Sequence, residues 1–187
     1  MAETYRRVLL NADAVRRSLA RMALEILERN RGTQGLALVG IVRRGDRLAR
    51  RIADHIRKAE GVEVPVGRLD ITLYRDDLGR KGAPPPLGPT DIPFSLDDRM
   101  VVLVDDVLYT GRTVRAALDA LVDLGRPRAI QLAVLVDRGH RELPIQPDYV
   151  GHAEPTRPEE EIEVRVGDDP SDDAVFLVEP GWDEGEV

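Results

Sequence analysis

The residues best suited to chemistry follow an apolar run, where two adjacent carboxylates, Asp105 and Asp106, precede a short polar segment. That segment contains Thr110, Gly111 and Thr113. A glycine lets the backbone approach a ligand closely, so backbone N–H groups and threonine hydroxyls can together bind a phosphate. The two carboxylates would repel a phosphate, but they can accept hydrogen bonds from vicinal hydroxyl groups. The pattern therefore predicts a site for a ribose phosphate rather than for a bare phosphate.

Two common phosphate-binding motifs do not describe this segment. Its spacing matches neither the G-x-x-x-x-G-K-[ST] loop of nucleoside triphosphatases nor the G-x-G-x-x-G turn of dinucleotide-binding proteins. A plain strand–helix turn, in which Asp and Thr cap the helix, is the structural alternative. Two acids, two threonines and a glycine directly after an apolar run favour the ligand-binding interpretation.

Apolar runs alternate with amphipathic segments along the chain, which is typical of an α/β domain with a mostly parallel central sheet flanked by helices. Strands are expected at 36–42, within 64–74, at 100–104, at 130–136 and, shorter, at 149–151 and 175–178. Helices are expected at 10–31, 46–59 and 114–124, and a polar turn at 105–113. Ligands of such sheets bind beyond the carboxyl ends of the strands. The turns after Val42, Val104 and Val136 should therefore meet at one edge.

Composition narrows the class of protein. The chain has 187 residues, 42% of them hydrophobic, which suits one domain over 1–187. The lack of cysteine excludes disulfides and thiolate metal sites. No apolar run approaches the roughly 20 residues that cross a bilayer, so we expect a cytoplasmic protein with no membrane partner. Residues 1–60 carry 14 Arg and Lys against 7 Asp and Glu, whereas residues 140–187 carry 3 against 15. This asymmetry indicates either a basic surface for an anionic partner or solvated helix faces and tails.

Segment 101–113 resembles the binding signature for 5-phosphoribosyl pyrophosphate (PRPP) of type I phosphoribosyltransferases. Segments 70–77, 118–127 and 131–144 narrow the resemblance to the PyrR family, whose members are pyrimidine operon regulators and also uracil phosphoribosyltransferases. The resemblance runs from about the first helix to about Gly151 and is weak after Pro158. It implies the type I phosphoribosyltransferase fold, with a small hood region above a mostly parallel sheet.

The resemblance implies that uracil and PRPP react to give UMP and diphosphate, with Mg²⁺ held mainly by PRPP. Asp105 and Asp106 should hold the ribose hydroxyls, act in catalysis and contribute weakly to the metal. Arg75 is the candidate clamp for the diphosphate, at the start of a polar, proline-rich loop over about 75–93 that the resemblance marks as a flexible lid. The residues expected to bind PRPP are Val42, Arg43, Arg44, Gly45, Asp105, Asp106, Val107, Leu108, Tyr109, Thr110, Gly111, Arg112 and Thr113.

The uracil should lie under the hood. The residues expected to contact it are Asp137, Arg138, Gly139 and Ile162. His140 could act as a general base, although a single loop histidine is more often a surface or packing residue. The acidic tail over about 180–187 is expected to be disordered.

The family's second role is uridine-nucleotide-dependent binding of pyrimidine operon leader mRNA, with UMP or UTP as co-ligand. The candidate RNA contacts are Arg16, Arg17, Arg21 and Arg141. The chain departs from the family pattern at Ala20, Leu24, Gln146 and His152. Two alternatives therefore stay open, an RNA-binding regulator with vestigial catalysis and a phosphoribosyltransferase for another base. The family also implies a homodimer or a higher homo-oligomer.

Overall fold

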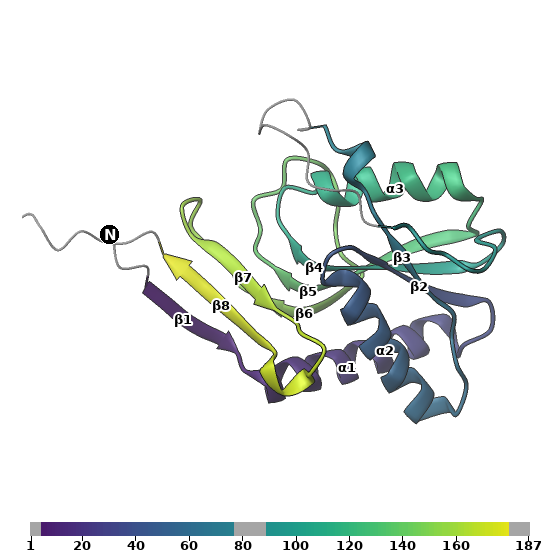
Figure 1. Ribbon diagram of the computed structural model, residues 1–187, viewed down its shortest axis with the longest axis horizontal. Coiled ribbons are helices and arrows are strands. Elements are labelled where there is room, and N and C mark those ends of the chain that lie inside the picture. The colour runs from purple at the N-terminus through teal and green to yellow at the C-terminus, as the bar shows by residue number, and fades with distance from the viewer. Residues whose placement is uncertain (1–4, 77–88, 180–187) are drawn as a thin grey trace, which may run out of the picture.

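A five-stranded parallel sheet forms the centre of the molecule (Figure 1). The computed structural model describes residues 5–76 and 89–179. The strands are β1 (Tyr5–Leu10), β2 (Leu36–Ile41), β3 (Val66–Leu69), β4 (Met100–Leu108), β5 (Ala129–Asp137), β6 (Tyr149–Ala153), β7 (Glu161–Arg165) and β8 (Ala174–Glu179). The helices are α1 (Ala12–Asn30), α2 (Gly45–Glu60) and α3 (Arg112–Leu124), with short 3₁₀ turns at Thr72–Tyr74 and Pro170–Asp172. The central sheet has the order β3-β2-β4-β5-β6, which confirms the predicted α/β class.

Helices cover both faces of this sheet. Helices α1 and α2 pack on one face, and α3 packs on the other (Figure 1). Strands buried on both faces read as continuous apolar runs, and all six residues of β2 are buried. Asn11 caps α1, since its side chain accepts a hydrogen bond from the N–H of Ala14 at 2.9 Å. The α1 helix ends at Asn30, and its C-cap residue Arg31 has the left-handed conformation. None of the helices within residues 5–76 and 89–179 is long and apolar enough to span a bilayer.

A second, antiparallel sheet joins the two ends of the described chain in the order β1-β8-β7. The sequence pattern indicated only the strand at 175–178, and β1 and β7 were missed. Ion pairs accompany the strand pairing: Arg6 lies 2.8 Å from Glu163, and Arg7 lies 2.8 Å from Glu154. The basic excess near the start of the sequence thus partly meets the acidic excess near its end within the fold.

Strand β4 is longer than the sequence suggested. The prediction of a polar turn over 105–113 is wrong for its first four residues, because β4 continues to Leu108. Asp105 aligns with Val134 and Leu108 aligns with Asp137 on β5, so ladder pairing outweighs the local preference of aspartate for turns. Likewise the expected strand within 64–74 ends at Leu69. Asp105 and Asp106, called the acid pair below, therefore lie within β4, close to its carboxyl end.

The start of α2 packs directly on the sheet through glycines. A Cβ atom on Gly40 would lie 2.3 Å from the Cα of Asp46, and one on Gly45 would lie 2.5 Å from the carbonyl oxygen of Val104. Atoms cannot approach so closely without a shift of the backbone. Only glycine at these two positions lets the first turn of α2 rest against β2 and β4.

Gly40→Ala should therefore destabilise the protein by about 1–3 kcal/mol or more, because β2 and the first turn of α2 must separate. The free energy of unfolding in urea measures this. Gly167→Ala is the matched control, since its Cβ would meet nothing closer than 3.9 Å. Equal stability of the two variants would contradict the close packing.

Candidate functional site

Two helix N-termini meet the carboxyl edge of the central sheet. Helix α2 begins after the loop that follows β2, and α3 begins after the loop that follows β4. The first N–H groups of a helix have no intrahelical acceptor. No side chain caps α2 at Arg44 or α3 at Gly111, whereas α1 has its cap. The N–H of Arg112, at the start of α3, makes a long 3.4 Å contact with Oγ1 of Thr110. The first turns of α2 and α3 therefore offer backbone donors to an anion at this edge.

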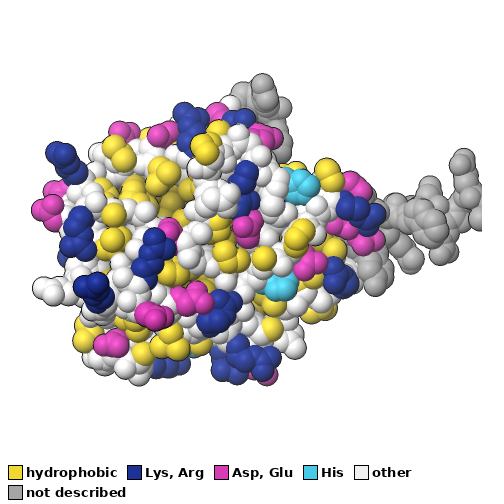
Figure 2. Space-filling model, turned by 180° about the vertical axis from the view of Figure 1, so that it is seen from behind, with side chains coloured by type: hydrophobic (Ala, Val, Ile, Leu, Met, Phe, Trp, Pro, Cys, Tyr) yellow, Lys and Arg dark blue, Asp and Glu magenta, His cyan; other side chains and the backbone are white. Residues whose placement is uncertain are grey.

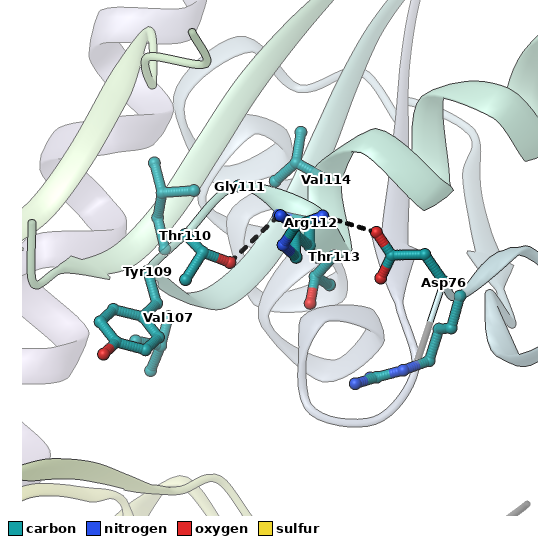
Figure 3. Close-up of a pocket in the computed structure, with 10 residues that line it drawn as sticks. Asp76, Val107, Tyr109, Thr110, Gly111, Arg112, Thr113 and Val114 are labelled. Atoms are coloured by element: carbon teal, nitrogen blue, oxygen red, sulfur yellow. Dashed lines mark hydrogen bonds and ion pairs between the residues drawn. The ribbon is translucent and has the colours of Figure 1, made fainter. Parts of the chain in front are cut away.

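The loop 109–111 and the first turn of α3 surround a cavity of about 280 Å³. Its lining comprises Arg75, Asp76 and the continuous segment 107–114 (Figure 3). Gly111 has φ 93°, a left-handed conformation that glycine adopts without steric strain. The predicted turn before the helix is present, but it comprises only residues 109–111.

A second cavity of about 470 Å³ adjoins the first, since Arg75, Val107 and Thr113 line both. It brings together the loop after β2 and the acid pair of β4. This agrees with the edge rule, by which ligands bind beyond the carboxyl ends of parallel strands. Its lining is Ile41, Val42, Arg43, Arg44, Arg68, Asp70, Ile71, Thr72, Arg75, Asp105, Asp106, Val107 and Thr113. Gly45 does not line it but is buried beneath it, against β4.

The two carboxylates of the acid pair differ in environment. Asp105 is buried, with 4% of its surface exposed, and burial raises the pKa of its carboxyl well above the usual range. The negative charge of Asp106 raises the same pKa further, against the opposing effect of Arg44. Asp106 is half-buried and ion-paired, with its Oδ2 2.8 Å from Nε of Arg44. The charge of Asp106 is thus compensated by Arg44, whereas burial disfavours the ionised form of Asp105.

Arg112 is the first residue of α3 and lines the first cavity, while its guanidinium bonds two carboxylates. Its guanidinium donates to Asp76 and to Glu142, each at 2.7 Å, and these bonds raise its pKa (Figure 3). The backbone N–H of Glu142 in turn donates to the carbonyl of Thr110 at 2.9 Å. Arg112 therefore connects the start of α3 to the segments that contain Asp76 and Glu142.

The residues expected to contact uracil lie close together at the end of β5. Asp137 accepts from Arg141 at 2.6 Å and from the N–H of Gly139 at 3.0 Å. Arg138 is buried, donates to Thr156 Oγ1 at 2.9 Å, and stacks 4.0 Å above the ring of Tyr109. Within the described chain, neither cavity is lined by any of these hood residues. They border the first cavity through Tyr109.

Two further hood residues have internal partners. Ile162 lies on β7, partly buried against the core between the central sheet and α1. His140 has its Nε2 2.6 Å from the carbonyl oxygen of Thr156 and its ring edge-on to Tyr109. This contact agrees with a packing role for His140.

The expected RNA contacts carry fewer uncompensated charges than the sequence suggested. Arg16 lies 3.2 Å from Asp13, and Arg21 lies 2.8 Å from Glu25 while also donating to two carbonyls of β6. Arg141 is largely buried among carbonyl and carboxylate acceptors. Arg17 is exposed on α1. Basic and acidic side chains also intermingle on the face seen in Figure 2.

Sequence reasoning missed three polar residues that line the second cavity, namely Arg68, Asp70 and Thr72. Asp70 Oδ1 accepts from the N–H and the hydroxyl of Thr72, at 2.8 and 2.6 Å. All three lie at or just after the end of β3, so the edge rule applied to this strand could have found them. The expected lid at 75–93 and tail at 180–187 lie mostly outside the described residues, although Arg75 lines both cavities.

The described residues contain no group of three His, Asp or Glu side chains that could hold a metal ion. Asp70, Asp105 and Asp106 line the second cavity and Asp76 lines the first, but Asp76 is paired with Arg112 and Asp106 with Arg44. This donor set fits a Mg²⁺ ion that is coordinated mainly by the oxygens of a phosphorylated substrate and by water.

Comparison with known proteins places this geometry among relatives. The family model described as "Phosphoribosyl transferase domain" matches residues 8–171. The bifunctional protein PyrR of Deinococcus radiodurans is 58% identical over 172 residues, covering 92% of this chain and 94% of the relative. That of Thermus thermophilus is 60% identical over 175 residues, covering 94% and 97%.

Solved structures of lower identity share the fold. A hypoxanthine phosphoribosyltransferase of Trypanosoma cruzi has a TM-score of 0.68 at 18% identity, covering 96% of this chain and 98% of the other. One from Staphylococcus aureus has a TM-score of 0.64 at 18% identity, covering 80% and 77%. At this identity the likeness bears on architecture alone.

The buried carboxyl of Asp105 makes stability depend on pH. Above the usual carboxyl pKa of about 4, and up to its raised pKa in the folded state, the native protein binds more protons than the unfolded chain. The free energy of unfolding should therefore lose an increment as pH rises through this window. Asp105→Asn removes that loss, so its stability relative to the parent protein should increase as pH rises above the usual carboxyl pKa towards the raised pKa of Asp105.

Urea unfolding of both proteins at several pH values measures this difference. Asp54→Asn, at a side chain that is 60% exposed, corrects for the loss of one negative charge. A difference between Asp105→Asn and the parent protein that stays flat with pH would show that burial does not perturb this carboxyl.

Proposed function

Because the chain belongs to the phosphoribosyltransferase family, and within it to the bifunctional PyrR proteins, we propose that it transfers the phosphoribosyl group of PRPP to uracil. The products are UMP and diphosphate. The observation that carries the proposal is the meeting of two helix N-termini without side-chain caps and one acid pair around two adjoining cavities. A substrate with phosphate groups on both sides of a diol fits this arrangement.

The 5-phosphate occupies the first cavity, where Thr110, Gly111 and Thr113 surround it. Backbone N–H groups and the N-terminus of α3 supply hydrogen bonds and partial positive charge. The diphosphate occupies the second cavity against Arg43, Arg44 and the start of α2. Between them, Asp105 and Asp106 accept hydrogen bonds from the ribose hydroxyls.

The reaction breaks the bond between C1 of the ribose and the diphosphate oxygen, and it forms a bond from C1 to a ring nitrogen of uracil. The bonding electrons leave with the diphosphate, and the proton of that nitrogen is released. Positive charge develops on the ribose, which the carboxylate of Asp106 can stabilise from a fixed position. Catalysis consists of positioning and electrostatic stabilisation, without a protein nucleophile.

Mg²⁺ accompanies PRPP, and when bound it offsets the charge of the diphosphate. Asp105 and Asp106 would supply at most one or two of its ligands. Burial of Asp105 and the pairing of Asp106 with Arg44 support this division, because neither carboxylate resembles a dedicated metal ligand.

The hood supports a pyrimidine as the acceptor base. Uracil presents an acceptor–donor–acceptor edge, which backbone N–H and C=O groups near Asp137 and Gly139 could recognise. Arg138 holds this segment in place through Thr156 and Tyr109. Identity of about 60% to PyrR proteins favours uracil, whereas the likeness to hypoxanthine-specific enzymes concerns the fold. Transfer to another base is the alternative that a substrate panel tests.

Regulation of pyrimidine genes is the second function that we propose, through binding of leader mRNA with UMP or UTP. The word "bifunctional" in the names of the relatives supports it. Arg17 is the preferred candidate contact on α1, because Arg16, Arg21 and Arg141 form ion pairs within the protein. A homodimer or higher oligomer stays a prediction.

The purified protein should form UMP from uracil and PRPP with Mg²⁺, and should form no nucleotide from hypoxanthine. Asp106→Asn should lower kcat/KM by about 10–100-fold, because the transition state loses a charged acceptor. Arg43→Ala should raise KM for PRPP by about tenfold. Steady-state assays measure these values, with Asp54→Asn as the matched carboxylate control.

If no base supports turnover and the protein binds RNA tightly, the alternative of an RNA-binding regulator with vestigial catalysis is correct. Turnover with hypoxanthine alone would assign another base.

Binding of a pyrimidine leader RNA should weaken in Arg17→Ala. The slope of log K against log salt concentration should become shallower by about one, the contribution of one phosphate contact. A gel-shift titration at several salt concentrations with UMP present measures both. Arg17 is preferable to Arg21 for this test, because loss of Arg21 also removes hydrogen bonds to Val150 and Gly151.

Arg128→Ala is the control, at an exposed arginine directly before β5 and therefore at the amino edge of the sheet. Equal affinities of Arg17→Ala and Arg128→Ala would remove α1 from the RNA surface.

A further inference from the structure

Arg68 lies on β3, the edge strand of the central sheet, and its side chain lines the second cavity. Its backbone is fixed on the outer side by a bridge to Asp91, with N–H to O distances of 2.8 and 2.9 Å in the two directions. Its side chain is about one-third exposed. The backbone of the residue is thus fixed on both sides, and its side chain lies at the cavity, close to Asp46 at the start of α2.

The guanidinium of Arg68 is poorly satisfied by the protein. Its Nη2 lies 3.9 Å from Oδ2 of Asp46, beyond normal hydrogen-bond distance. Its Nε is buried and has no hydrogen-bond partner among the described residues. A buried N–H without an acceptor is unfavourable, so a conformation in which Nε and Nη both meet an anion would be preferred.

The same cavity contains a cation that already has two close partners. Arg44 pairs with Asp106 at 2.8 Å and donates to the carbonyl of Val164 at 2.9 Å. A diphosphate entering the cavity would have to break those contacts to take the guanidinium of Arg44. Arg68 requires no such exchange beyond its long contact with Asp46.

We propose that Arg68 binds the diphosphate group of PRPP through a bidentate contact, in which the diphosphate replaces Asp46 as the partner of the guanidinium. This inference rests on the proposed function and adds a residue to its diphosphate subsite. Planar guanidinium groups match two phosphate oxygens at once, which a lysine ammonium does not. Asp46, at the start of α2, keeps the arginine near the cavity without binding it closely.

Arg68→Ala should raise KM for PRPP and the inhibition constant of inorganic diphosphate by about tenfold or more. KM for uracil and the dissociation constant of UMP should stay unchanged, because neither molecule carries the diphosphate. Arg68→Lys should recover part of the loss, since it keeps the charge without the bidentate geometry. Steady-state kinetics and calorimetric titration with magnesium diphosphate and with UMP measure the four quantities.

Arg57→Ala is the matched control, because this exposed arginine of α2 pairs with Asp54 and lines neither cavity. Unchanged values for PRPP and diphosphate in Arg68→Ala would overturn the inference. An equal loss for UMP, present in Arg68→Lys as well, would also overturn it in favour of a purely structural role.

The two proposals fail separately. A parent protein without turnover contradicts the proposed function, while calorimetric binding of magnesium diphosphate still decides the role of Arg68. Turnover by the parent protein with an unaffected Arg68→Ala variant contradicts only the inference.

Discussion

The close contact between the first turn of α2 and the central sheet is the constraint on which the site depends. Gly40 and Gly45 lack the Cβ atoms that would push α2 away from β2 and β4. This approach places the N-terminus of α2 beside the acid pair of β4, at the edge where α3 also begins. A helix moved outward by the width of a methyl group would leave the cavity wider and its N–H groups too distant for the same ligand.

The burial of Asp105 also follows from that contact. Gly45 lies against the backbone of Val104 and Asp105, so α2 begins directly beside the buried side chain of Asp105. Arg44, one residue earlier, pairs with Asp106 and with the carbonyl of Val164 on β7. Further along α2, Arg47 and Arg51 donate to the carbonyl oxygens of Val166 and Gly167, which directly follow β7. One helix therefore contacts both the acid pair of β4 and, through Arg44, strand β7.

The sequence predicted what local patterns determine. Apolar runs identified β2, β4 and β5, and the edge rule brought the 42–45 loop next to Asp105. Strands β1 and β7 were missed because YRRVLL and EIEVR are short and charged, and their pairing joins distant parts of the chain. The partners of Arg112 and Arg141 were equally hidden, since tertiary neighbours rather than spacing decide where a long side chain points. The charge asymmetry between the chain ends proved to be partly complementary within the fold.

Pairing within the protein also bears on how a polyanionic substrate binds. Around the two cavities, carboxylates already accompany several cations, as in the contacts of Asp106 with Arg44 and of Asp76 with Arg112. A phosphate group that recruits such an arginine gains only the difference between the new contact and the old one. Backbone N–H groups at the two helix N-termini have no carboxylate partner among the described residues, and that of Arg112 makes only a long 3.4 Å contact with Oγ1 of Thr110. Affinity for phosphate should therefore arise mainly from the backbone, with the arginines adjusting the balance of charge and the orientation of the ligand.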